Sequence, residues 1–323
     1  MDPRGRFAPS PTGELHLGNA RTAILAWLWA RSEGGGFTLR VEDLDRPRVR
    51  PGLLQRQLEE LAWLGLDWDE GPDPRSGADR GPRGPYRQSE RGADYQAALA
   101  RLGESVYECF CSRAEIAAAS APHGPQDDGP RYPGTCAQLT AAQRSERRRT
   151  RAPALRLRVP PGPVRFQDEL QGPQEFDPQA TVGDFVLRRA DGIFAYQLAV
   201  VVDDAAMGIG QVLRGEDLLP STARQILLYR LLGAPQPRWA HAPLVLGRSG
   251  ERLSKRDRAA SLFALRKSGA DPRKLVASLC VLSGLPALPG RSLSERVPGF
   301  GLDLVSRGAV RVDESLAAAA NVG

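Results

Sequence analysis

The sequence predicts an α/β fold whose parallel sheet is divided by an insertion, and three observations support this prediction. Up to residue 105 of the 323, short apolar strands alternate with amphipathic helices. From Val106 this pattern gives way to sequence rich in Cys, Pro, Gly and Arg, and sheet-like runs return after residue 190. Because alternating strands and helices are typical of a parallel sheet covered by crossover helices, we expect a Rossmann-like domain. Its halves are predicted at 1–105 and 191–245, with an insertion at 106–190 and a helical tail at 246–323.

In the first half, apolar residues recur at the spacings of strands and helices. The helix expected at Gly18–Ser32 places Ile24 and Leu28 on one face, as a helix that covers a sheet requires. The stretch at 70–90 is rich in Gly, Pro, Asp and Arg and is predicted to be a loop. The predicted elements are strands at Gly5–Ala8 and Phe37–Val41 and helices at Gly18–Ser32 and Gly52–Leu64.

The remaining predicted strands lie in the insertion and in the second half of the sheet. Short β-branched and aromatic runs predict the strands, and apolar residues at helical spacing predict the helices. A turn-rich run is expected to lead from the first of these helices to Arg258. We expect strands at Ala154–Val159, Val164–Asp168, Phe185–Ala190, Ile193–Asp203 and Val212–Arg214, and helices at Ser221–Leu232, 259–267 and 271–283.

Composition excludes several classes of protein. With 41% hydrophobic and 25% charged residues, the chain has the balance of a globular protein. Its longest apolar stretches, Ala23–Ala30 and Leu275–Leu282, are far shorter than the ~20 residues of a membrane-spanning helix. The N-terminal residues lack the apolar core of a secretory signal. We therefore expect a cytoplasmic protein with reduced thiols and no membrane association.

Positive charge is concentrated in one segment. Between Ala141 and Arg158 there are seven arginines and one acid, Glu146, so this segment alone matches the formal net charge of +6. Such a block suits a phosphate-binding surface, although it is also typical of a solvated helix face. Lysine, in contrast, occurs only at positions 255, 267 and 274.

Near the N-terminus, the sequence RFAPSPTGELHLGN at 6–19 predicts a strand, a Pro/Gly turn and the start of a helix. A helix N-terminus presents backbone N–H groups without intrahelical partners and therefore favours an anion. His16 and Asn19 would add side-chain donors. The alternative is an ordinary connection between a strand and a helix, in which His16 makes only local hydrogen bonds.

A second stretch, GRSGERLSKR at 247–256, is rich in Gly, Ser and basic residues. It offers the ammonium of Lys255 together with two guanidiniums, which suits a phosphate chain that gains charge during phosphoryl or nucleotidyl transfer. By itself this stretch is equally consistent with a solvated basic loop. The occurrence of both motifs in one chain is more specific than either.

The two motifs resemble the signatures of class I aminoacyl-tRNA synthetases. His16-Leu17-Gly18-Asn19 resembles their HIGH motif, and RLSKR at 252–256 resembles their KMSKS loop; Asn19, Arg252 and Arg256 depart from the family's residues. The similarity covers roughly 4–260, with the motifs in the family's order. Four stretches resemble the glutamyl branch of this family, namely RFAPSPTGELHLGNARTA at 6–23, RVEDLD at 40–45, VVVDD at 200–204 and VLRGED at 212–217.

The resemblance implies a glutamate pocket beside an ATP site. Glu42 suits the ammonium of glutamate, and the fork of Arg214 suits its side-chain carboxylate, although both could otherwise be unrelated surface charges. His16, Asn19 and Lys255 are implied to be catalytic, through positioning and charge stabilisation on Mg-ATP. The implied glutamate-binding residues are Arg6, Phe7, Ala8, Pro9, Ser10, Glu42, Tyr196 and Arg214, and the implied ATP-binding residues are His16, Gly18, Asn19, Arg252, Ser254 and Lys255.

Chain length favours one subgroup of this branch. Only 67 residues follow Arg256, so we expect a small helical stem-contact region and no anticodon-binding domain. This short form resembles the synthetases that activate L-glutamate with ATP and attach it to queuosine at the wobble position of tRNA(Asp). Val200, where longer glutamyl enzymes usually carry Asn, favours the same subgroup.

Two alternatives remain open. One is a truncated glutamyl-tRNA synthetase that charges a tRNA 3′ end, and the other is a catalytically silent RNA-binding relative. We expect a monomer in which the arginines of 144–158 contact RNA phosphates.

The cysteines predict a metal site in the insertion. Cys109, Cys111 and Cys136 offer three soft ligands, and in a reducing compartment these favour one structural zinc ion over disulfides. The resemblance implies Tyr132 as the fourth ligand, and His123 in the same loop is a chemical alternative. Two buried thiols without a metal would also explain the first pair. Cys280, in an apolar run, is predicted to be a core thiol.

Overall fold

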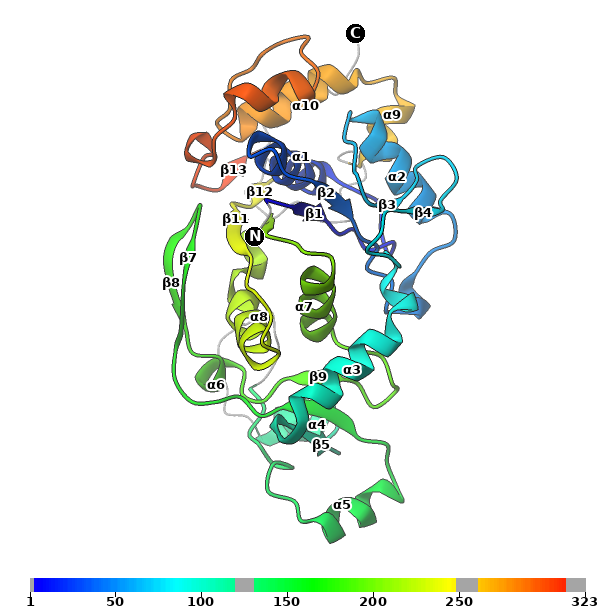
Figure 1. Ribbon diagram of the computed structural model, residues 1–323, viewed down its shortest axis with the longest axis vertical. Coiled ribbons are helices and arrows are strands. Elements are labelled where there is room, and N and C mark those ends of the chain that lie inside the picture. The colour runs from blue at the N-terminus through cyan, green and yellow to red at the C-terminus, as the bar shows by residue number, and fades with distance from the viewer. Residues whose placement is uncertain (1–2, 120–130, 248–260, 312–323) are drawn as a thin grey trace.

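The computed structural model describes residues 3–119, 131–247 and 261–311. Figure 1 shows an elongated molecule, with α1, α9 and α10 around the central strands at one end and the insertion with α4 and α5 at the other. None of the helices in these described ranges has the length and apolar character needed to cross a lipid bilayer.

The central strands form two parallel pairs, as the sequence predicts for its two halves. In the first pair Gly5 lies opposite Phe37, and in the second Gln211 lies opposite Arg238. The pairs meet where the N–H of Gln211 donates to the carbonyl of Arg4 at 3.0 Å, so strands about 200 residues apart in sequence lie side by side. The strands are β1 (Gly5–Phe7), β2 (Phe37–Leu39), β10 (Gln211–Gly215) and β11 (Arg238–Ala242).

Helices cover both faces of these strands. Side chains alternate between the faces along β10: Leu213 packs into the core beneath α1, and Val212 into the core beneath α7 and α8. Cys280 is buried in the first of these cores, as predicted. The helices of this region are α1 (Leu17–Ser32), α2 (Leu53–Trp63), α3 (Gly92–Leu102), α7 (Tyr196–Ala206), α8 (Leu219–Leu231), α9 (Leu262–Lys267) and α10 (Pro272–Leu282).

The insertion adds a small antiparallel sheet and a β-hairpin. The hairpin reaches back to the central strands, because Asp168 of β7 lies opposite Trp239 of β11. The insertion therefore contributes residues beside β11. Its elements are β5 (Val106–Cys109), β6 (Ala154–Leu157), β7 (Val164–Asp168), β8 (Gly172–Phe176), β9 (Val186–Arg188), α4 (Arg113–Ala119), α5 (Ala141–Arg148) and α6 (Pro178–Thr181).

One predicted strand is wrong. The run Ile193–Asp203 contains the helix α7, which begins at Tyr196. The β-branched residues at 200–202 favour a strand, but the side chains at the successive positions Leu198 to Val201 are all buried, in a helix that contacts α3, α8 and β9. Because the segment is buried on several sides, apolar residues stand at consecutive positions. The sequence then shows neither the alternation typical of a strand nor the spacing typical of a helix.

Short elements also interrupt the predicted loops. The stretch at 70–90 contains a two-stranded ribbon, and the turn-rich run before Arg258 contains β11 and β12. The remaining short strands in the described ranges are β3 (Gly71–Pro72), β4 (Asp79–Arg80), β12 (Val245–Leu246) and β13 (Val310–Arg311). The 3₁₀ helices in these ranges are Arg46–Arg48, Gln88–Glu90, Gly103–Ser105, Glu216–Leu218, Ser294–Gly299 and Leu302–Leu304.

Candidate active site and metal centre

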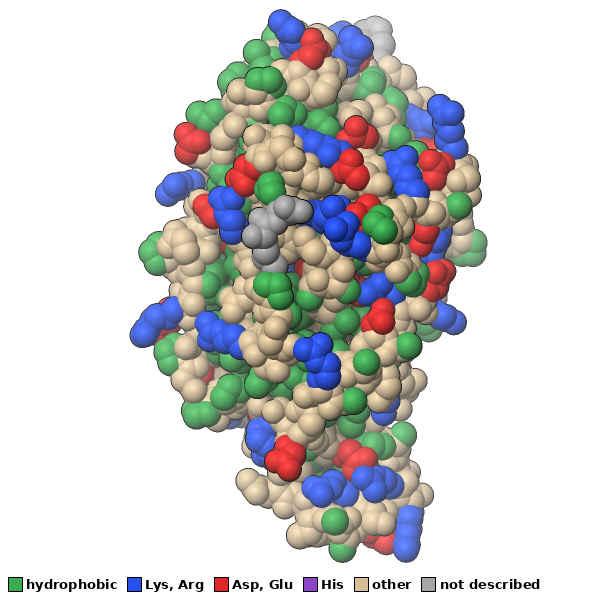
Figure 2. Space-filling model, viewed as in Figure 1, with side chains coloured by type: hydrophobic (Ala, Val, Ile, Leu, Met, Phe, Trp, Pro, Cys, Tyr) green, Lys and Arg blue, Asp and Glu red, His purple; other side chains and the backbone are tan. Residues whose placement is uncertain are grey.

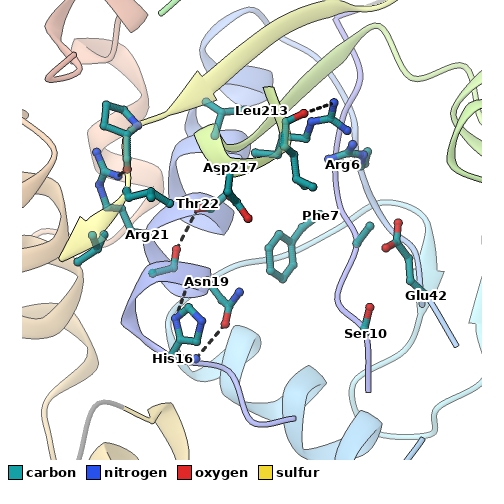
Figure 3. A pocket seen from close by; sticks show the side chains of 18 of the residues that line it. Arg6, Phe7, Ser10, His16, Asn19, Arg21, Thr22, Glu42, Leu213 and Asp217 are labelled. Atoms are coloured by element: carbon teal, nitrogen blue, oxygen red, sulfur yellow. Dashed lines mark hydrogen bonds between the residues drawn. The ribbon is translucent and has the colours of Figure 1, made fainter. Parts of the chain in front are cut away.

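A cavity of about 430 Å³ lies where β1 and β10 end and α1 begins. In parallel α/β sheets, ligands bind beyond the carboxyl ends of the strands. Figure 3 shows His16, Asn19 and Thr22 along α1 on one side of the cavity and Arg6, Ser10 and Glu42 on the other. The predicted site residues that line it are Arg6, Phe7, Ala8, Ser10, His16, Gly18, Asn19, Glu42, Tyr196 and Arg214.

Pro9 is a predicted pocket residue that does not line this cavity. It is buried, and its carbonyl accepts the backbone N–H of Glu42 at 3.0 Å. Pro9 therefore holds the backbone that carries Glu42. The predicted ATP-site residues Arg252, Ser254 and Lys255 lie outside the described residues.

His16 and Asn19 cap the first turn of α1. The Nδ1 atom of His16 accepts the N–H of Asn19 at 3.3 Å, and the Oδ1 atom of Asn19 accepts the N–H of His16 at 3.1 Å. This reciprocal capping fixes both side chains at the N-terminus of α1. Because Nδ1 accepts, a neutral His16 carries its proton on Nε2 and can donate there.

The residues flanking the RLSKR segment lie beside this helix N-terminus. On the N-terminal flank, Val245 lines the cavity. On the C-terminal flank, Ser261 forms an antiparallel bridge with His16, and the N–H of Leu262 donates to the carbonyl of Leu15 at 2.8 Å. The described residues on both flanks, Val245 and Ser261, therefore lie near the start of α1 at the cavity.

On the opposite side, Glu42 is held by a buried ionic network. Its Oε1 atom lies 3.3 Å from Arg40, whose guanidinium is fully buried and also pairs with Asp203 and Asp204 at the end of α7. Arg6 pairs with Asp204 at 3.4 Å. Burial raises the pKa of Glu42, and the charges of Arg40 and Arg6 act in the opposite direction. A cation bound in the cavity would stabilise the ionised carboxylate further.

Arg214 enters the cavity from β10, and its hydrogen-bond partners within the described part of the chain are all neutral. Its Nε atom donates to His241 at 3.0 Å, Nη1 to Gln225 at 2.9 Å and Nη2 to Thr222 at 2.8 Å. Longer bonds of 3.3 Å reach Tyr196 and the carbonyl of Leu218. Among the described residues no carboxylate forms an ion pair with this guanidinium, and burial lowers its pKa. The site therefore contains a buried cation that an anionic ligand would neutralise.

Several lining residues do not follow from the sequence. Arg21 and Thr22 belong to the quoted N-terminal motif, and their place one turn after Gly18 on α1 is a signal that could have identified them. Arg21 is almost fully buried; it donates to Ser283 and to the carbonyl of Pro243, and burial lowers its pKa to about 10. The other additional lining residues are Leu213, Gly215, Asp217, Leu218, Pro243, Leu244 and Val245.

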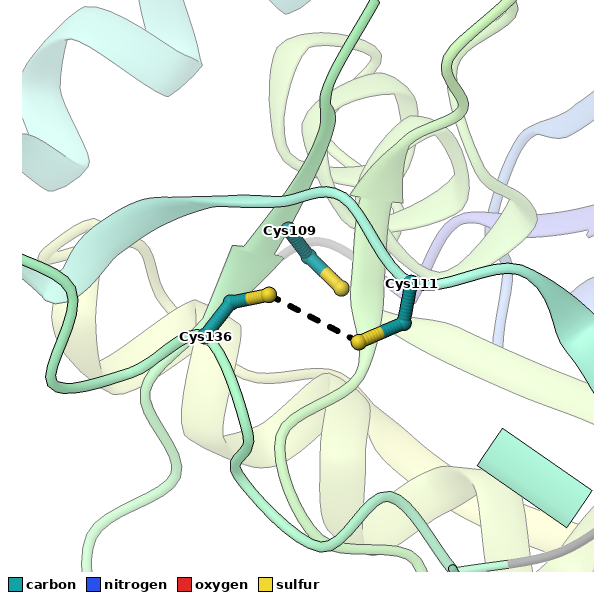
Figure 4. Close-up of side chains that lie close together, drawn as sticks. All are labelled: Cys109, Cys111 and Cys136. Atoms are coloured by element: carbon teal, nitrogen blue, oxygen red, sulfur yellow. Dashed lines mark hydrogen bonds between the residues drawn. The ribbon is translucent and has the colours of Figure 1, made fainter. Parts of the chain in front are cut away.

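The structure brings Cys109, Cys111 and Cys136 together in the insertion (Figure 4). Their sulfur atoms lie within 4.8 Å of one another, and those of Cys111 and Cys136 are 3.6 Å apart. The Oη atom of Tyr132 lies 3.3 Å from the sulfur of Cys109 and 4.0 Å from that of Cys111. All four cysteines of the chain are free thiols.

These separations fit a tetrahedral metal site. Zn–S bonds of ~2.3 Å and Zn–O bonds of ~2.0–2.2 Å place neighbouring ligand atoms roughly 3.6–3.8 Å apart. The backbone holds Tyr132 in place, because Tyr132 forms a parallel bridge with Gly183 and its N–H donates to the carbonyl of Val182 at 2.9 Å. The other fourth-ligand candidate, His123, lies outside the described residues.

The arginine-rich segment divides into two parts. Arg144 to Arg151 lie on or just after α5, at the far end of the insertion, where Figure 2 shows basic and acidic side chains close together. Three of these arginines form ion pairs, namely Arg148 with Glu108, Arg149 with Glu146 and Arg151 with Glu115.

The second part of this segment is structural. Arg156 is buried, lies 3.8 Å above the ring of Tyr132 and donates to the carbonyl of Asp184. The surface available to phosphates is therefore less basic than the sequence suggests.

The parallel strands, the capped α1 motif and the cavity beyond the strand ends together define a class I synthetase catalytic domain. The family model described as "tRNA synthetases class I (E and Q), catalytic domain" matches residues 4–297. The chain belongs to this family, as the motifs indicate.

The chain matches two curated relatives over most of their length. The chain is 52% identical to "Glutamyl-Q tRNA(Asp) synthetase" of Symbiobacterium thermophilum, over 99% of this chain and 98% of that protein. It is 51% identical to the protein of the same name from Nitratidesulfovibrio vulgaris, over 87% of this chain and 86% of that protein.

A solved structure is similar as well. The glutamate-tRNA synthetase of Elizabethkingia anophelis superposes with a TM-score of 0.83 at 30% identity, and the match covers 99% of this chain and 70% of that one. The fold of the catalytic domain therefore agrees with that of the glutamyl enzymes.

Proposed function

We propose that this protein activates L-glutamate with ATP to glutamyl adenylate and transfers the glutamate to queuosine at the wobble position of tRNA(Asp). The observation that carries the proposal is Arg214, a buried guanidinium at the cavity whose partners among the described residues are all neutral. The subgroup is supported by relatives of matching length that carry the name of this activity.

In the first step, the α-carboxylate of glutamate attacks the α-phosphate of ATP and pyrophosphate leaves. Glu42 binds the ammonium, and Arg214 binds the side-chain carboxylate by donating from Nη1 and Nη2, where its present bonds are longest. Tyr196, Ser10 and Arg6 orient the α-group. His16 and Asn19, fixed by mutual capping, donate to the nucleotide with Lys255. An RNA hydroxyl then attacks the acyl carbon of the mixed anhydride and AMP leaves, so no protein nucleophile is required.

The first test is pyrophosphate exchange. We expect glutamate and ATP to support ATP–pyrophosphate exchange in the absence of any tRNA, because Glu42 and Arg214 are already held by protein residues around the cavity. Exchange that appears only after tRNA is added would contradict this prediction. A protein without exchange under either condition would instead be a silent RNA-binding relative.

The acceptor is tested with two forms of tRNA(Asp). Transfer of labelled glutamate to tRNA with queuosine, and not to matched unmodified tRNA, supports the proposal. Transfer to a 3′ end that is independent of queuosine supports a truncated glutamyl-tRNA synthetase.

We further propose that Cys109, Cys111 and Cys136 hold one structural zinc ion with Tyr132 as the fourth ligand. The ion would pin the 131–136 turn to β5 and would supply no chemistry to the reaction. Protein purified without chelators should contain about one zinc per chain by metal analysis, with Zn–S distances of ~2.3 Å in X-ray absorption. Tyr132→Phe should weaken zinc retention in a chelator titration, while His123→Ala should not. The reverse result would assign the fourth position to His123, and metal-free protein would exclude the site.

A further inference from the structure

His241 links the insertion to the cavity through a buried chain of polar contacts. His241 on β11 and Asp168 on β7 are both fully buried, and His241 Nδ1 lies 2.6 Å from the Oδ2 atom of Asp168. On the other side of the ring, Nε2 lies 3.0 Å from Nε of Arg214. Neither His241 nor Asp168 lines the cavity itself.

The position of the proton on His241 is fixed by its two neighbours, Arg214 and Asp168. A guanidinium can only donate, so Nε2 of His241 must accept from Arg214. The single proton of a neutral imidazole then lies on Nδ1 and is donated to Asp168. Burial lowers the pKa of His241 to about 4; Asp168 acts in the opposite direction and Arg214 in the same direction. Neutral His241 is therefore the form present near pH 7.

Asp168 is itself held rigidly. Its Oδ1 atom accepts three backbone N–H groups, from Leu170 at 3.0 Å, Gln171 at 2.9 Å and His241 at 3.1 Å. Its negative charge is thus fixed one imidazole ring away from the Arg214 guanidinium. A carboxylate in direct contact with Arg214 would compete with the carboxylate of a ligand, whereas the neutral ring keeps the two groups apart.

The N–H donors of Arg214 form two groups of hydrogen bonds, which differ in length and in their partners. The three short bonds go to His241, Gln225 and Thr222, none of which lines the cavity. The two longer bonds go to Tyr196 and Leu218, which do line it. One donor on each terminal nitrogen is therefore directed toward a residue of the cavity wall, and a carboxylate that bridges the two nitrogens would accept from both.

We propose that Asp168 and His241 act as a positioning pair, which orients Arg214 and partly balances its charge so that its fork selects the side-chain carboxylate of the substrate. This inference rests on the proposed function, because it assumes that Arg214 binds glutamate. The pair touches no substrate and acts through Arg214 alone.

Three substitutions test the pair. Asp168→Asn preserves volume, but its amide group facing Nδ1 would force the imidazole proton onto Nε2, against the donor of Arg214. His241→Asn reaches toward Asp168 and loses the acceptor for Arg214. His241→Gln places its carbonyl oxygen near the position of Nε2 and keeps that acceptor, so it serves as the conservative variant.

The readouts are the KM values for glutamate and ATP in pyrophosphate exchange, and the ratio of kcat/KM for glutamate to that for glutamine. We expect Asp168→Asn and His241→Asn to raise the KM for glutamate about tenfold and to lower the ratio similarly, with the KM for ATP within about twofold, the scale of one impaired charged hydrogen bond. His241→Gln should lie closer to wild type. This specificity ratio does not depend on the fraction of folded protein. It therefore tests the positioning role even for a variant that is less stable.

An unchanged ratio in both Asp168→Asn and His241→Asn would overturn the positioning role, as would equal losses for glutamate and ATP. Failure of the proposed function is a different result, because wild-type protein would then show no exchange with glutamate at all.

Discussion

Arg214→Ala should abolish the use of glutamate and leave ATP binding nearly intact. The guanidinium is buried, and its hydrogen-bond partners among the described residues are neutral, so a ligand carboxylate would be a counter-charge in direct contact with it. Loss of such a charged hydrogen-bond partner costs ~1.5–3 kcal/mol, which corresponds to roughly 10- to 150-fold in glutamate affinity before the effect on orientation is added. ATP–pyrophosphate exchange and equilibrium binding of labelled ATP measure the two effects separately.

The matched control is Arg238→Ala. Arg238 begins β11 but is half exposed and pairs with Glu33 and Glu169 outside the cavity. Its loss should change neither affinity by more than about twofold, as is usual for exposed ion pairs. Equal loss of glutamate and ATP binding in Arg214→Ala would show that this residue supports the cavity as a whole and does not select the amino acid.

Lys255→Ala should lower the rate of adenylation by ~10²–10³-fold, the usual effect of removing one electrostatic donor from a transition state. The chain uses arginine at nearly every basic position, so a lysine flanked by Arg252 and Arg256 indicates a requirement for a compact ammonium. The described flanking residues Ser261 and Val245 lie beside His16 and at the cavity wall, respectively. Single-turnover formation of glutamyl adenylate measures the rate.

Two further variants sharpen this test. Lys255→Arg keeps the charge and should still lose much of the rate, because a planar fork does not replace an ammonium. Lys274→Ala removes an exposed lysine from α10 and should leave the rate unchanged. Undiminished exchange in Lys255→Ala would show that RLSKR is only a solvated basic loop.

Local signals predicted much of this molecule. The motif at 6–19 predicted β1, the turn and α1 to within one residue, because a strand, a Pro/Gly turn and a capping residue all act over short distances. The cysteine cluster was predicted for a similar reason, since Cys109 and Cys111 are only two residues apart, at and just after the end of β5. In contrast, α7 was predicted to be a strand, because its burial by three surrounding elements is a tertiary effect.

The positioning pair could not be predicted from the sequence. His241 and Arg214 are 27 residues apart, and Asp168 is 73 residues from His241, in a hairpin that was predicted to belong to the insertion. Only the alignment of β7, β10 and β11 brings them together. An aspartate in a hairpin and a single histidine in a strand carry no local sign of a shared role.

The position of β10 beside β1 has a consequence for how the protein is made. β1 is complete after residue 7, but its neighbour is synthesised only at residues 211–215, which at ~5–20 residues per second leaves its edge open for roughly 10–40 s. Contacts between such distant segments form late, because closing a long loop costs entropy before the contact repays it. Within the insertion, β5, β6 and β9 pair with one another and β7 pairs with β8, so these contacts can form before β11 is synthesised. The cavity is therefore completed last, and a nascent chain cannot be stabilised by ATP or an amino acid until most of its length has emerged.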